Sequence, residues 1–289
     1  MAELWTKNKE IEFFRKALEN FVELEQLFYI SDDDKYYAYW PKSYKGKKST
    51  LQSRNALIGN FTEKYSVDLL HNFAQRQGLY AVQGVICKEI GLTPQSPSDV
   101  AICKVKKREQ IAEDIVAIFE VKMSIVWNWE YRNGELICRG DYRTHQGNPG
   151  LLRSDSMLKA IGKSINIRVS GYKASKIPII ILGNTPITES YFNKVDHLKQ
   201  SGIIQGFWSM NPHPLDNNGE NIKSTPKKGF IRFDSIPELS NALDELLSNE
   251  MEFFSSMKSK KELGQIIEIA NKEVTFELKA EKFLKLIKE

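Results

Sequence analysis

One apolar run that carries two opposite charges constrains the fold of this chain more than any other feature. Residues 115–123 read Ile-Val-Ala-Ile-Phe-Glu-Val-Lys-Met, which is typical of a buried β-strand. Side chains alternate along a strand, so Glu120 and Lys122 project from the same face. Asp99 opens the preceding apolar strand, and the charged connector 104–110 suits an exposed turn between antiparallel strands. One hairpin is therefore expected to bring Asp99, Glu120 and Lys122 together.

These three side chains have the chemistry of a phosphodiester-hydrolysing site. Two carboxylates bind a hard divalent cation such as Mg²⁺ through oxygen. A nearby ammonium can orient or help to deprotonate a water and can stabilise negative charge on a phosphoryl group. The alternative is structural, because a surface Glu and Lys on an edge strand with an Asp in a turn would give the same residues. The strong β pattern and the acidic partner one strand earlier favour the catalytic interpretation.

At these residues the chain resembles the PD-(D/E)XK nuclease motif. The match consists of Pro97-Ser98-Asp99 followed by Glu120-Val121-Lys122, and it covers only residues 97–122. The pattern departs from the family in one respect, since Ser98 separates the proline from the aspartate. The resemblance implies that Asp99, Glu120 and the backbone carbonyl of Val121 hold Mg²⁺, which Mn²⁺ can replace. It also implies that Lys122 assists the attacking water.

The size of the chain and the elements around the motif resemble a type II restriction endonuclease. This resemblance implies an α/β fold of the restriction-endonuclease type, with a central mixed β-sheet flanked by helices. It implies Mg²⁺-dependent, sequence-specific hydrolysis of double-stranded DNA to 5′-phosphate and 3′-hydroxyl ends, within a restriction-modification system. A palindromic target would require a two-fold homodimer. Two alternatives stay open: a DNA-repair or junction-resolving nuclease of the same fold, and a non-catalytic DNA-binding protein.

Length and composition fit one folded domain. The 289 residues are 41% hydrophobic and 27% charged, which is ordinary for a protein with a sizeable core. We expect a single domain over residues 1–289, with a helical N-terminal region to about residue 80 and a helical extension over about residues 236–289. The net charge of +4 does not by itself indicate nucleic acid, so the distribution of charge carries more information.

Several protein classes are disfavoured by what the sequence lacks. It has no apolar run of the roughly 20 residues that span a bilayer, and its first residues lack a signal-peptide pattern, so we expect a cytoplasmic protein without membrane contact. The cysteines are odd in number and lie in apolar contexts, which predicts reduced core thiols. The four histidines show no metal-ligand spacing, which argues against zinc chemistry.

The strongest local basic patch lies between residues 40 and 62, where no acidic side chain occurs. Its cations stand among aromatic residues, and we expect them to grip the phosphate backbone of DNA. A flexible solvated loop is the alternative. The candidate DNA-binding residues of this patch are Lys42, Lys45, Lys47, Lys48 and Arg54.

A second group of candidate DNA contacts follows the motif. The irregular stretch 140–153 carries side chains that can donate to base edges and phosphates, although a polar surface loop would have the same composition. A helix is expected over residues 154–169, with Met157, Ile161, Ile165 and Val169 facing the core and a basic face along DNA. The candidates are Arg143, His145, Arg153, Asp155, Lys159 and Lys163, with Arg153 and Asp155 favoured for base readout.

Two helices are expected before the motif. Residues 8–30 have apolar residues at helical spacing, and the triplet at residues 32–34 should end that helix in a solvated turn. Residues 55–77 form a second amphipathic pattern. The resemblance implies that Glu63 in this helix supports the metal site, as a helical glutamate does in many PD-(D/E)XK nucleases. An ordinary exposed glutamate is an equal alternative.

The remaining elements follow from apolar runs and turn signals. A strand is expected within residues 80–90, and a hairpin over residues 125–138 turns at Asn133-Gly134 and should lie outside the core. Strand, helix and strand over 177–182, 188–200 and 203–210 imply a parallel crossover. A long loop over 211–229, an edge strand over 230–233, a helix over 237–249 and a helical tail over 258–289 complete the expected order.

Overall fold

The structure is a computed structural model that describes residues 3–20, 22–31, 34–48, 51–216, 221–248, 252–254 and 258–288. Contacts divide the chain into two compact units, residues 1–250 (unit 1) and residues 251–289 (unit 2). The helix over residues 236–248 belongs to unit 1, so the separate C-terminal part begins at residue 251 and not near residue 236.

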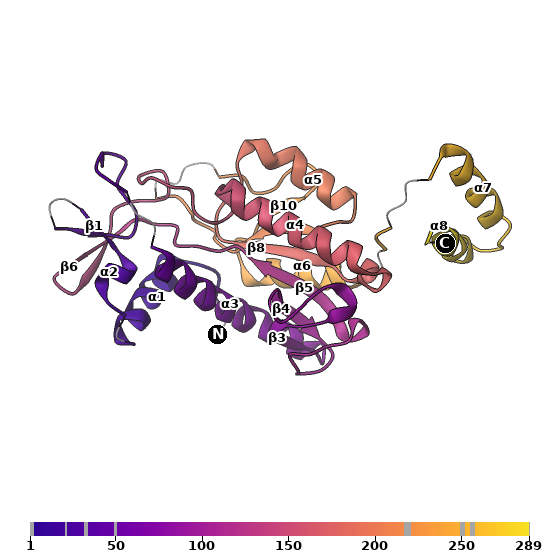
Figure 1. Cartoon of the computed structure of the whole chain (residues 1–289), viewed down its shortest axis with the longest axis horizontal. Coiled ribbons are helices and arrows are strands. Elements are labelled where there is room, and N and C mark those ends of the chain that lie inside the picture. Colours follow the sequence, from indigo (N-terminus) through magenta and orange to yellow (C-terminus); the bar gives the residue numbers. More distant parts are fainter. Residues whose placement is uncertain are drawn as a thin grey trace. The chain divides into compact units, whose positions relative to one another are not determined.

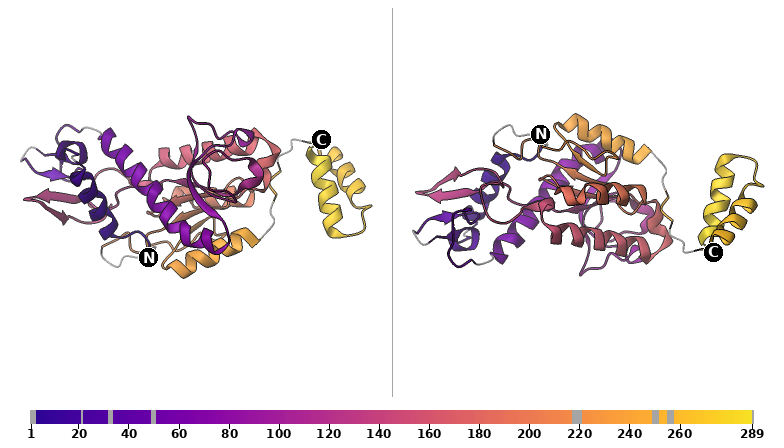
Figure 2. Two further views of the ribbon diagram at one scale, coloured as in Figure 1. Left: turned by 90° about the horizontal axis from the view of Figure 1, so that it is seen from below. Right: turned by 90° about the horizontal axis from the view of Figure 1, so that it is seen from above.

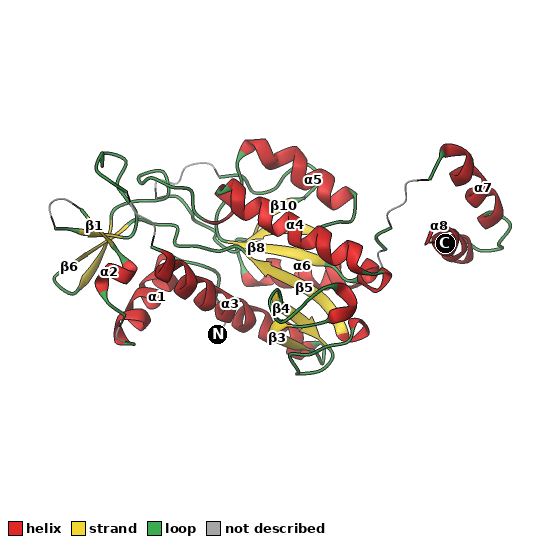
Figure 3. Cartoon of the chain, viewed as in Figure 1, coloured by secondary structure: helices red, strands yellow, loops and turns green. Residues whose placement is uncertain are grey.

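Unit 1 is built on a six-stranded mixed β-sheet (Figures 1 and 3). Its strands run in the order β10-β9-β8-β5-β4-β3, with β3 and β4 antiparallel to their neighbours and the other pairs parallel. The parallel crossover expected from the sequence is confirmed, and so is the short strand at the sheet edge. The strands are β3 (Tyr80–Val85), β4 (Ser98–Cys103), β5 (Ile115–Val121), β8 (Ile179–Gly183), β9 (Gly206–Ser209) and β10 (Phe230–Arg232).

Helices cover both faces of this sheet, which makes unit 1 an α/β structure of three layers. Helices α3 (Gln52–Arg76) and α6 (Ile236–Ser248) share a buried apolar cluster with Phe119 and Leu182 on one face. Helices α4 (Ser154–Ser170) and α5 (Phe192–Gln200) share a second cluster with Ile118 and Ile181 on the other. Figure 2 shows the two faces in turn, with α3 in front on the left and α4 and α5 in front on the right. Because side chains alternate along β5 and β8, both strands contribute apolar residues to the cluster on each face of the sheet.

A second, smaller sheet lies outside the six-stranded one. Its order is β1-β2-β6-β7, and all its pairs are antiparallel. The predicted hairpin turn at Asn133 and Gly134 is confirmed, since both residues have positive φ. The strands are β1 (Tyr29–Ile30), β2 (Tyr36–Tyr37), β6 (Trp129–Arg132) and β7 (Glu135–Cys138). The hairpin is thus separate from the central sheet, but the expectation that residues 125–138 lie outside the core is wrong, because Val126, Trp127 and Trp129 belong to the same buried apolar cluster as Phe119.

The N-terminal helix is shorter than the apolar pattern predicted. Helix α1 covers Lys7–Glu19, and a separate turn, α2, covers Leu24–Leu27. At the helix end, the Lys16 carbonyl accepts hydrogen bonds from the side-chain amide of Asn20 at 2.6 Å and from its backbone N–H at 3.2 Å, an arrangement that suits the last turn of a helix. Of the acidic triplet, residues 32 and 33 lie outside the described residues.

The orientation predicted for α4 is wrong. Met157 faces the core, but Ile165 is 40% exposed and Val169 is 71% exposed. The buried residues of this helix are Met157, Ala160, Ser164, Ile167 and Arg168. The buried face is not the Ile161, Ile165 and Val169 stripe, since Ala160, Ser164 and Ile167 pack inward together with Met157. Lys163 is consequently turned toward the sheet and not toward solvent.

Unit 2 consists of α7 (Lys260–Ala270) and α8 (Phe276–Lys288). Ser259 caps α7 by accepting a hydrogen bond from the Glu262 backbone N–H, while the Glu262 carboxylate accepts from the Ser259 N–H. Phe254 packs edge-on against Phe283 at 5.7 Å between ring centroids. The helical tail is therefore confirmed over its described residues.

Short 3₁₀ turns connect the elements of unit 1. They cover Lys88–Ile90, Ala112–Asp114, Gly150–Leu152, Tyr172–Lys176 and Glu189–Tyr191.

No described helix is long and apolar enough to cross a membrane. The three cysteines are free thiols, as expected.

Candidate active site

The hairpin of β4 and β5 brings the three motif residues together. The strands pair antiparallel with Val100 opposite Phe119, so the next position on each strand holds Asp99 and Glu120. The backbone N–H of Val121 donates to Asp99 Oδ2 at 2.7 Å. Both carboxylates lie on the face of the sheet that α4 covers, since Ile118, two positions before Glu120, belongs to the cluster packed on α4.

Lys122 lies against both carboxylates. Its Nζ is 3.2 Å from Asp99 Oδ2 and 3.6 Å from Glu120 Oε2, and it donates to the Val121 carbonyl at 3.0 Å. Asp99 and Lys122 keep about a fifth of their side-chain surface exposed, whereas Glu120 is fully buried. The site therefore opens to solvent at Asp99 and Lys122 and is closed behind Glu120.

A second lysine enters the same cluster from α4. Lys163 Nζ is 2.8 Å from Glu120 Oε2 and 3.4 Å from Asp99 Oδ1, and it donates to the Pro97 carbonyl at 2.5 Å. The sequence analysis placed Lys163 on an outward basic face, and that placement is wrong. The missed signal was spacing, because Lys163 stands three residues after Ala160 and four before Ile167, which are both fully buried.

The charges of the cluster shift its pKa values in different directions. Burial and the neighbouring charge of Asp99 raise the pKa of Glu120 to about 7, although both lysines oppose the shift. Burial also acts to raise the pKa of Asp99, but Lys122, Lys163 and the Val121 N–H outweigh it and hold that pKa below 3.8. Burial lowers the pKa of Lys122, yet the two carboxylates more than compensate and leave it raised. Lys122 is therefore an ammonium at neutral pH.

The oxygens of this cluster fit a hard divalent cation. Both carboxylate oxygens of Glu120 are buried, and within the described structure Oε2 faces the two lysine ammonium groups while Oε1 has no hydrogen-bond donor. Asp99 and the Val121 carbonyl add oxygen ligands next to it. Carboxylate and carbonyl oxygens are the ligands of Mg²⁺ and Mn²⁺. Among the described residues, no group of three or more His, Cys, Asp or Glu is placed to hold a metal ion. The cluster itself offers two carboxylates and a carbonyl.

Glu63 lies on α3 within electrostatic reach of this cluster. Its Oε2 accepts a hydrogen bond from the Gln83 side chain at 2.9 Å. Burial raises its pKa, Gln83 opposes that shift, and the charge of Asp99 adds to it. Glu63 therefore stands near the site and is held by Gln83, and its support of a metal stays a prediction.

Two of the predicted DNA contacts are buried, so the structure contradicts that role. Arg54 is 3% exposed, donates to the carbonyls of Leu27 and Ala38, and lies over the Tyr39 ring. His145 is also 3% exposed and stacks on Tyr39 with ring centroids 4.0 Å apart. Both side chains join the small sheet to its surroundings. Sequence alone could not separate them from exposed neighbours, because basic and polar residues surround them in the chain.

The other lysines of the basic loop are exposed, and the structure ties their loop to the second predicted segment. Lys42, Lys45, Lys47 and Lys48 all face solvent. The side-chain amide of Gln146 donates to the Pro41 carbonyl at 2.9 Å and to the Tyr44 carbonyl at 2.7 Å. The two stretches that the sequence analysis singled out separately are thus neighbours in space.

The remaining predicted contacts are engaged in ion pairs with acidic neighbours. Arg143 and Asp141 are 2.9 Å apart, and Arg153 and Asp155 are 2.8 Å apart. Lys159 lies 3.8 Å from Asp155 and is 77% exposed. Arg153 and Asp155 are each about half exposed, so both can still meet a ligand at the surface.

Glu10 is a structural residue that the sequence analysis missed. Its carboxylate accepts hydrogen bonds from the indole N–H groups of Trp5 and Trp129 and from the backbone N–H groups of Val126 and Trp127. Burial raises its pKa to about 7, and these four donors oppose the shift. The signal was its place on the buried face of α1, three and four residues before Phe13 and Phe14. Glu10 fixes the segment that follows the motif strand.

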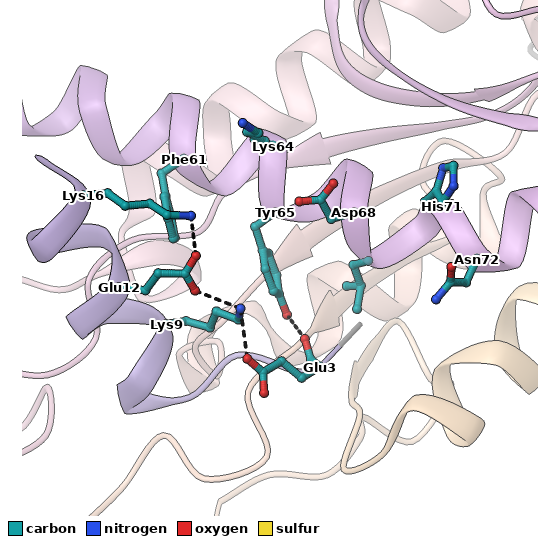
Figure 4. A pocket seen from close by; sticks show the side chains of 11 residues that line it. Glu3, Lys9, Glu12, Lys16, Phe61, Lys64, Tyr65, Asp68, His71 and Asn72 are labelled. Atoms are coloured by element: carbon teal, nitrogen blue, oxygen red, sulfur yellow. Dashed lines mark hydrogen bonds and ion pairs between the residues drawn. The ribbon is translucent and has the colours of Figure 1, made fainter. Parts of the chain in front are cut away.

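A cavity of about 400 Å³ lies elsewhere, between α1 and α3 (Figure 4). Lys9 bridges Glu3 and Glu12 there, and Lys16 also pairs with Glu12. Its wall on α3 includes Phe61, Tyr65 and Asp68, and Glu63 lies about 200° around the helix from Phe61, on the opposite side. The cavity is therefore separate from the carboxylate cluster, and its charged groups on the α1 side are paired with one another.

No family model, curated protein or solved structure matches this chain.

Proposed function

We propose that this protein is a metal-dependent nuclease of the PD-(D/E)XK type that hydrolyses phosphodiester bonds in double-stranded DNA. The observation that carries the proposal is the convergence of Asp99, Glu120 and Lys122 at one end of the β4–β5 hairpin. Two carboxylates and an ammonium that are buried on three sides by a sheet and a helix are costly to a fold without a function. The α/β architecture with a mixed sheet is compatible with a restriction-endonuclease-like fold.

The residues divide the chemistry among them. Asp99, Glu120 and the Val121 carbonyl would hold Mg²⁺ or Mn²⁺, which supplies Lewis-acid stabilisation of the phosphoryl group and a more acidic water. Lys122, as an ammonium, donates to the attacking water or to a phosphate oxygen and holds it for in-line attack. It does not act as the initial base in that protonation state. The resemblance to the family implies that the water displaces the 3′ oxygen, which takes a proton from solvent as it leaves, so that the products carry 5′-phosphate and 3′-hydroxyl ends.

DNA contacts are proposed for the exposed loop lysines. Lys42, Lys45, Lys47 and Lys48 supply positive charge that a phosphate backbone attracts, and Gln146 fixes the path of their loop. Arg153 and Asp155 are proposed as base contacts at the start of α4. A palindromic target would bring two copies of the chain to one site, one for each strand.

Within this class we favour a type II restriction endonuclease of a restriction-modification system over a repair or junction-resolving nuclease. The small sheet with its basic loop, added to the central sheet, gives a larger DNA-facing surface than a minimal junction nuclease needs. A non-catalytic DNA-binding protein would have no need of the paired buried charges.

Digestion of several sequenced plasmid and phage DNAs tests the proposal. We expect discrete, reproducible fragments with Mg²⁺ and intact DNA with EDTA. Fragment ends that map to one sequence support the restriction assignment, whereas cutting confined to branched or damaged DNA supports repair. Intact DNA under all conditions, with folded protein that binds duplex, contradicts nuclease activity.

A further inference from the structure

Lys163 contacts the same carboxylates as the motif lysine but from the opposite layer of the fold. Its ammonium meets one oxygen of Glu120, one of Asp99 and the carbonyl of Pro97, all at 2.5 to 3.4 Å. Its helix is anchored by the fully buried Ala160 and Ile167 on the same side. The ammonium is therefore held at the carboxylates by the fold and is not a long surface chain that happens to lie there.

The two lysines together surround the oxygen atoms of the site. Lys122 contacts Asp99 Oδ2 and the Val121 carbonyl, Lys163 contacts Asp99 Oδ1, and both face Glu120 Oε2, with Lys163 closer at 2.8 Å than Lys122 at 3.6 Å. These are the oxygens that fit a divalent cation. Like charges repel strongly at contact distance in a partly buried site, so a divalent cation and both ammonium groups cannot share these atoms.

We propose that Lys163 competes with the divalent cation for Glu120 and Asp99, and that it contacts a phosphate oxygen of the DNA once it is displaced. The second part rests on the nuclease function proposed above. An ammonium that leaves two carboxylates needs another anion nearby, and the phosphate to be cleaved is the anion that such a site receives. Lys163 is then a second active-site lysine, supplied by α4 and absent from the Glu120-Val121-Lys122 triplet.

Competition and phosphate contact predict opposite effects of one substitution. In Lys163→Gln the amide can still donate to the Pro97 carbonyl, but the charge is lost. We expect this variant to bind Mn²⁺ roughly tenfold more tightly than the wild type, because one repelling charge is gone. We also expect it to cleave DNA roughly tenfold or more slowly at saturating metal, because a phosphate contact is gone. A residue with a purely structural role would not tighten metal binding.

Mn²⁺ binding is measured without DNA, by the loss of the free Mn²⁺ signal in electron paramagnetic resonance during a titration. Lys194→Gln on α5 is the matched control, since Lys194 is exposed and lies over the Tyr191 ring, and its affinity should equal that of the wild type. Lys163→Met is a second variant that also removes the hydrogen bond to Pro97.

Unchanged or weaker Mn²⁺ binding by folded Lys163→Gln and Lys163→Met overturns the competition. Tighter binding with unchanged cleavage overturns the phosphate contact. Cleavage by the wild type is measured separately, so failure of the proposed nuclease function can be distinguished from failure of the competition. If the wild type is inactive but the variants bind Mn²⁺ more tightly, the competition is supported and the nuclease function is contradicted.

Discussion

Asp99 and Glu120 are neighbours with different surroundings, and the difference sets their roles. Burial acts to raise the pKa of Asp99, but the charges of Lys122 and Lys163 and the hydrogen bond from the Val121 N–H outweigh it and leave that pKa below its usual value. Glu120 is closed off, and burial raises its pKa to about 7. A cation that binds both carboxylates must therefore compete with protons at Glu120 more than at Asp99.

The motif residues could be predicted from the sequence, but their second lysine could not. Alternation along one strand was enough to place Glu120 and Lys122 on the same face. Lys163 lies 41 residues beyond Lys122, on a helix whose buried face depends on how the helix packs on the sheet. The predicted DNA contacts of Arg54 and His145 were wrong for a related reason. Whether a basic side chain is buried depends on carbonyl partners that are distant in the sequence.

Glu10 gives a prediction for stability. Its carboxylate faces four N–H donors, so Glu10→Gln turns one acceptor atom into a donor that opposes another N–H. We expect the free energy of unfolding to fall by about 1–3 kcal/mol. Urea unfolding followed by circular dichroism measures it. Glu12→Gln on the exposed side of α1 is the control and should change the free energy by less than about 1 kcal/mol; equal effects in both variants would contradict the role of Glu10.

Among the elements, strands were easier to predict than helix limits. The apolar runs of β5 and β8 can only be accommodated in a sheet covered on both sides, and the helices that cover it follow from the crossover connections. The end of α1 at Glu19 coincides with the hydrogen bonds from Asn20 to the Lys16 carbonyl, although the apolar pattern continues beyond it. Local capping of this kind is weakly visible in an apolar pattern.

The edge of the sheet depends on Asp196 of α5. Its carboxylate accepts hydrogen bonds from the Thr225 hydroxyl at 2.5 Å and from the backbone N–H groups of Lys227 and Gly229 at 3.0 and 2.8 Å. Burial acts to raise its pKa, but these donors outweigh it and leave the pKa below 3.8. Asp196 thus holds the turn that leads into β10.

This arrangement predicts a pH-dependent effect of Asp196→Asn. A carboxyl group whose pKa is lower in the folded state stabilises the fold above 3.8, and this stabilisation is lost as the pH falls through the folded-state pKa. At pH 7 we expect the variant to lose about 1–3 kcal/mol of unfolding free energy. The difference from the wild type should shrink in strong acid. Urea unfolding at pH 7 and pH 3 tests this, and a difference that does not depend on pH would contradict it.

At the scale of the whole molecule, the central sheet, both apolar clusters and the candidate site all lie within unit 1. The sequence predicted a single domain because charged helical residues near the C-terminus gave no boundary signal. The end of a compact unit depends on which helices contact one another in the folded chain, and the sequence pattern does not show these contacts. The separate packing of α7 against α8 follows from such contacts.

We therefore expect residues 1–250 to fold without the last 39 residues, because they form a compact unit of their own that contains the central sheet and both apolar clusters. Thermal unfolding of this fragment should be cooperative, with a midpoint within a few degrees of the midpoint of unit 1 in the full chain. A fragment that lacks a cooperative transition would show that unit 2 is needed for the fold.

The proposed nuclease site is tested most directly by the rate of duplex cleavage with Mg²⁺. This rate is compared between the wild type, Asp99→Asn, Lys122→Ala and the control Asp244→Asn. The Asp244 carboxylate on α6 is exposed and accepts a hydrogen bond from Gln77. Duplex binding and circular dichroism are measured on the same samples. We predict that the wild type and Asp244→Asn cleave at similar rates, and that both site variants bind DNA but cleave roughly a hundredfold or more slowly. Cleavage by Asp99→Asn at the wild-type rate, or no cleavage by a wild type that binds DNA, would contradict the assignment of this site.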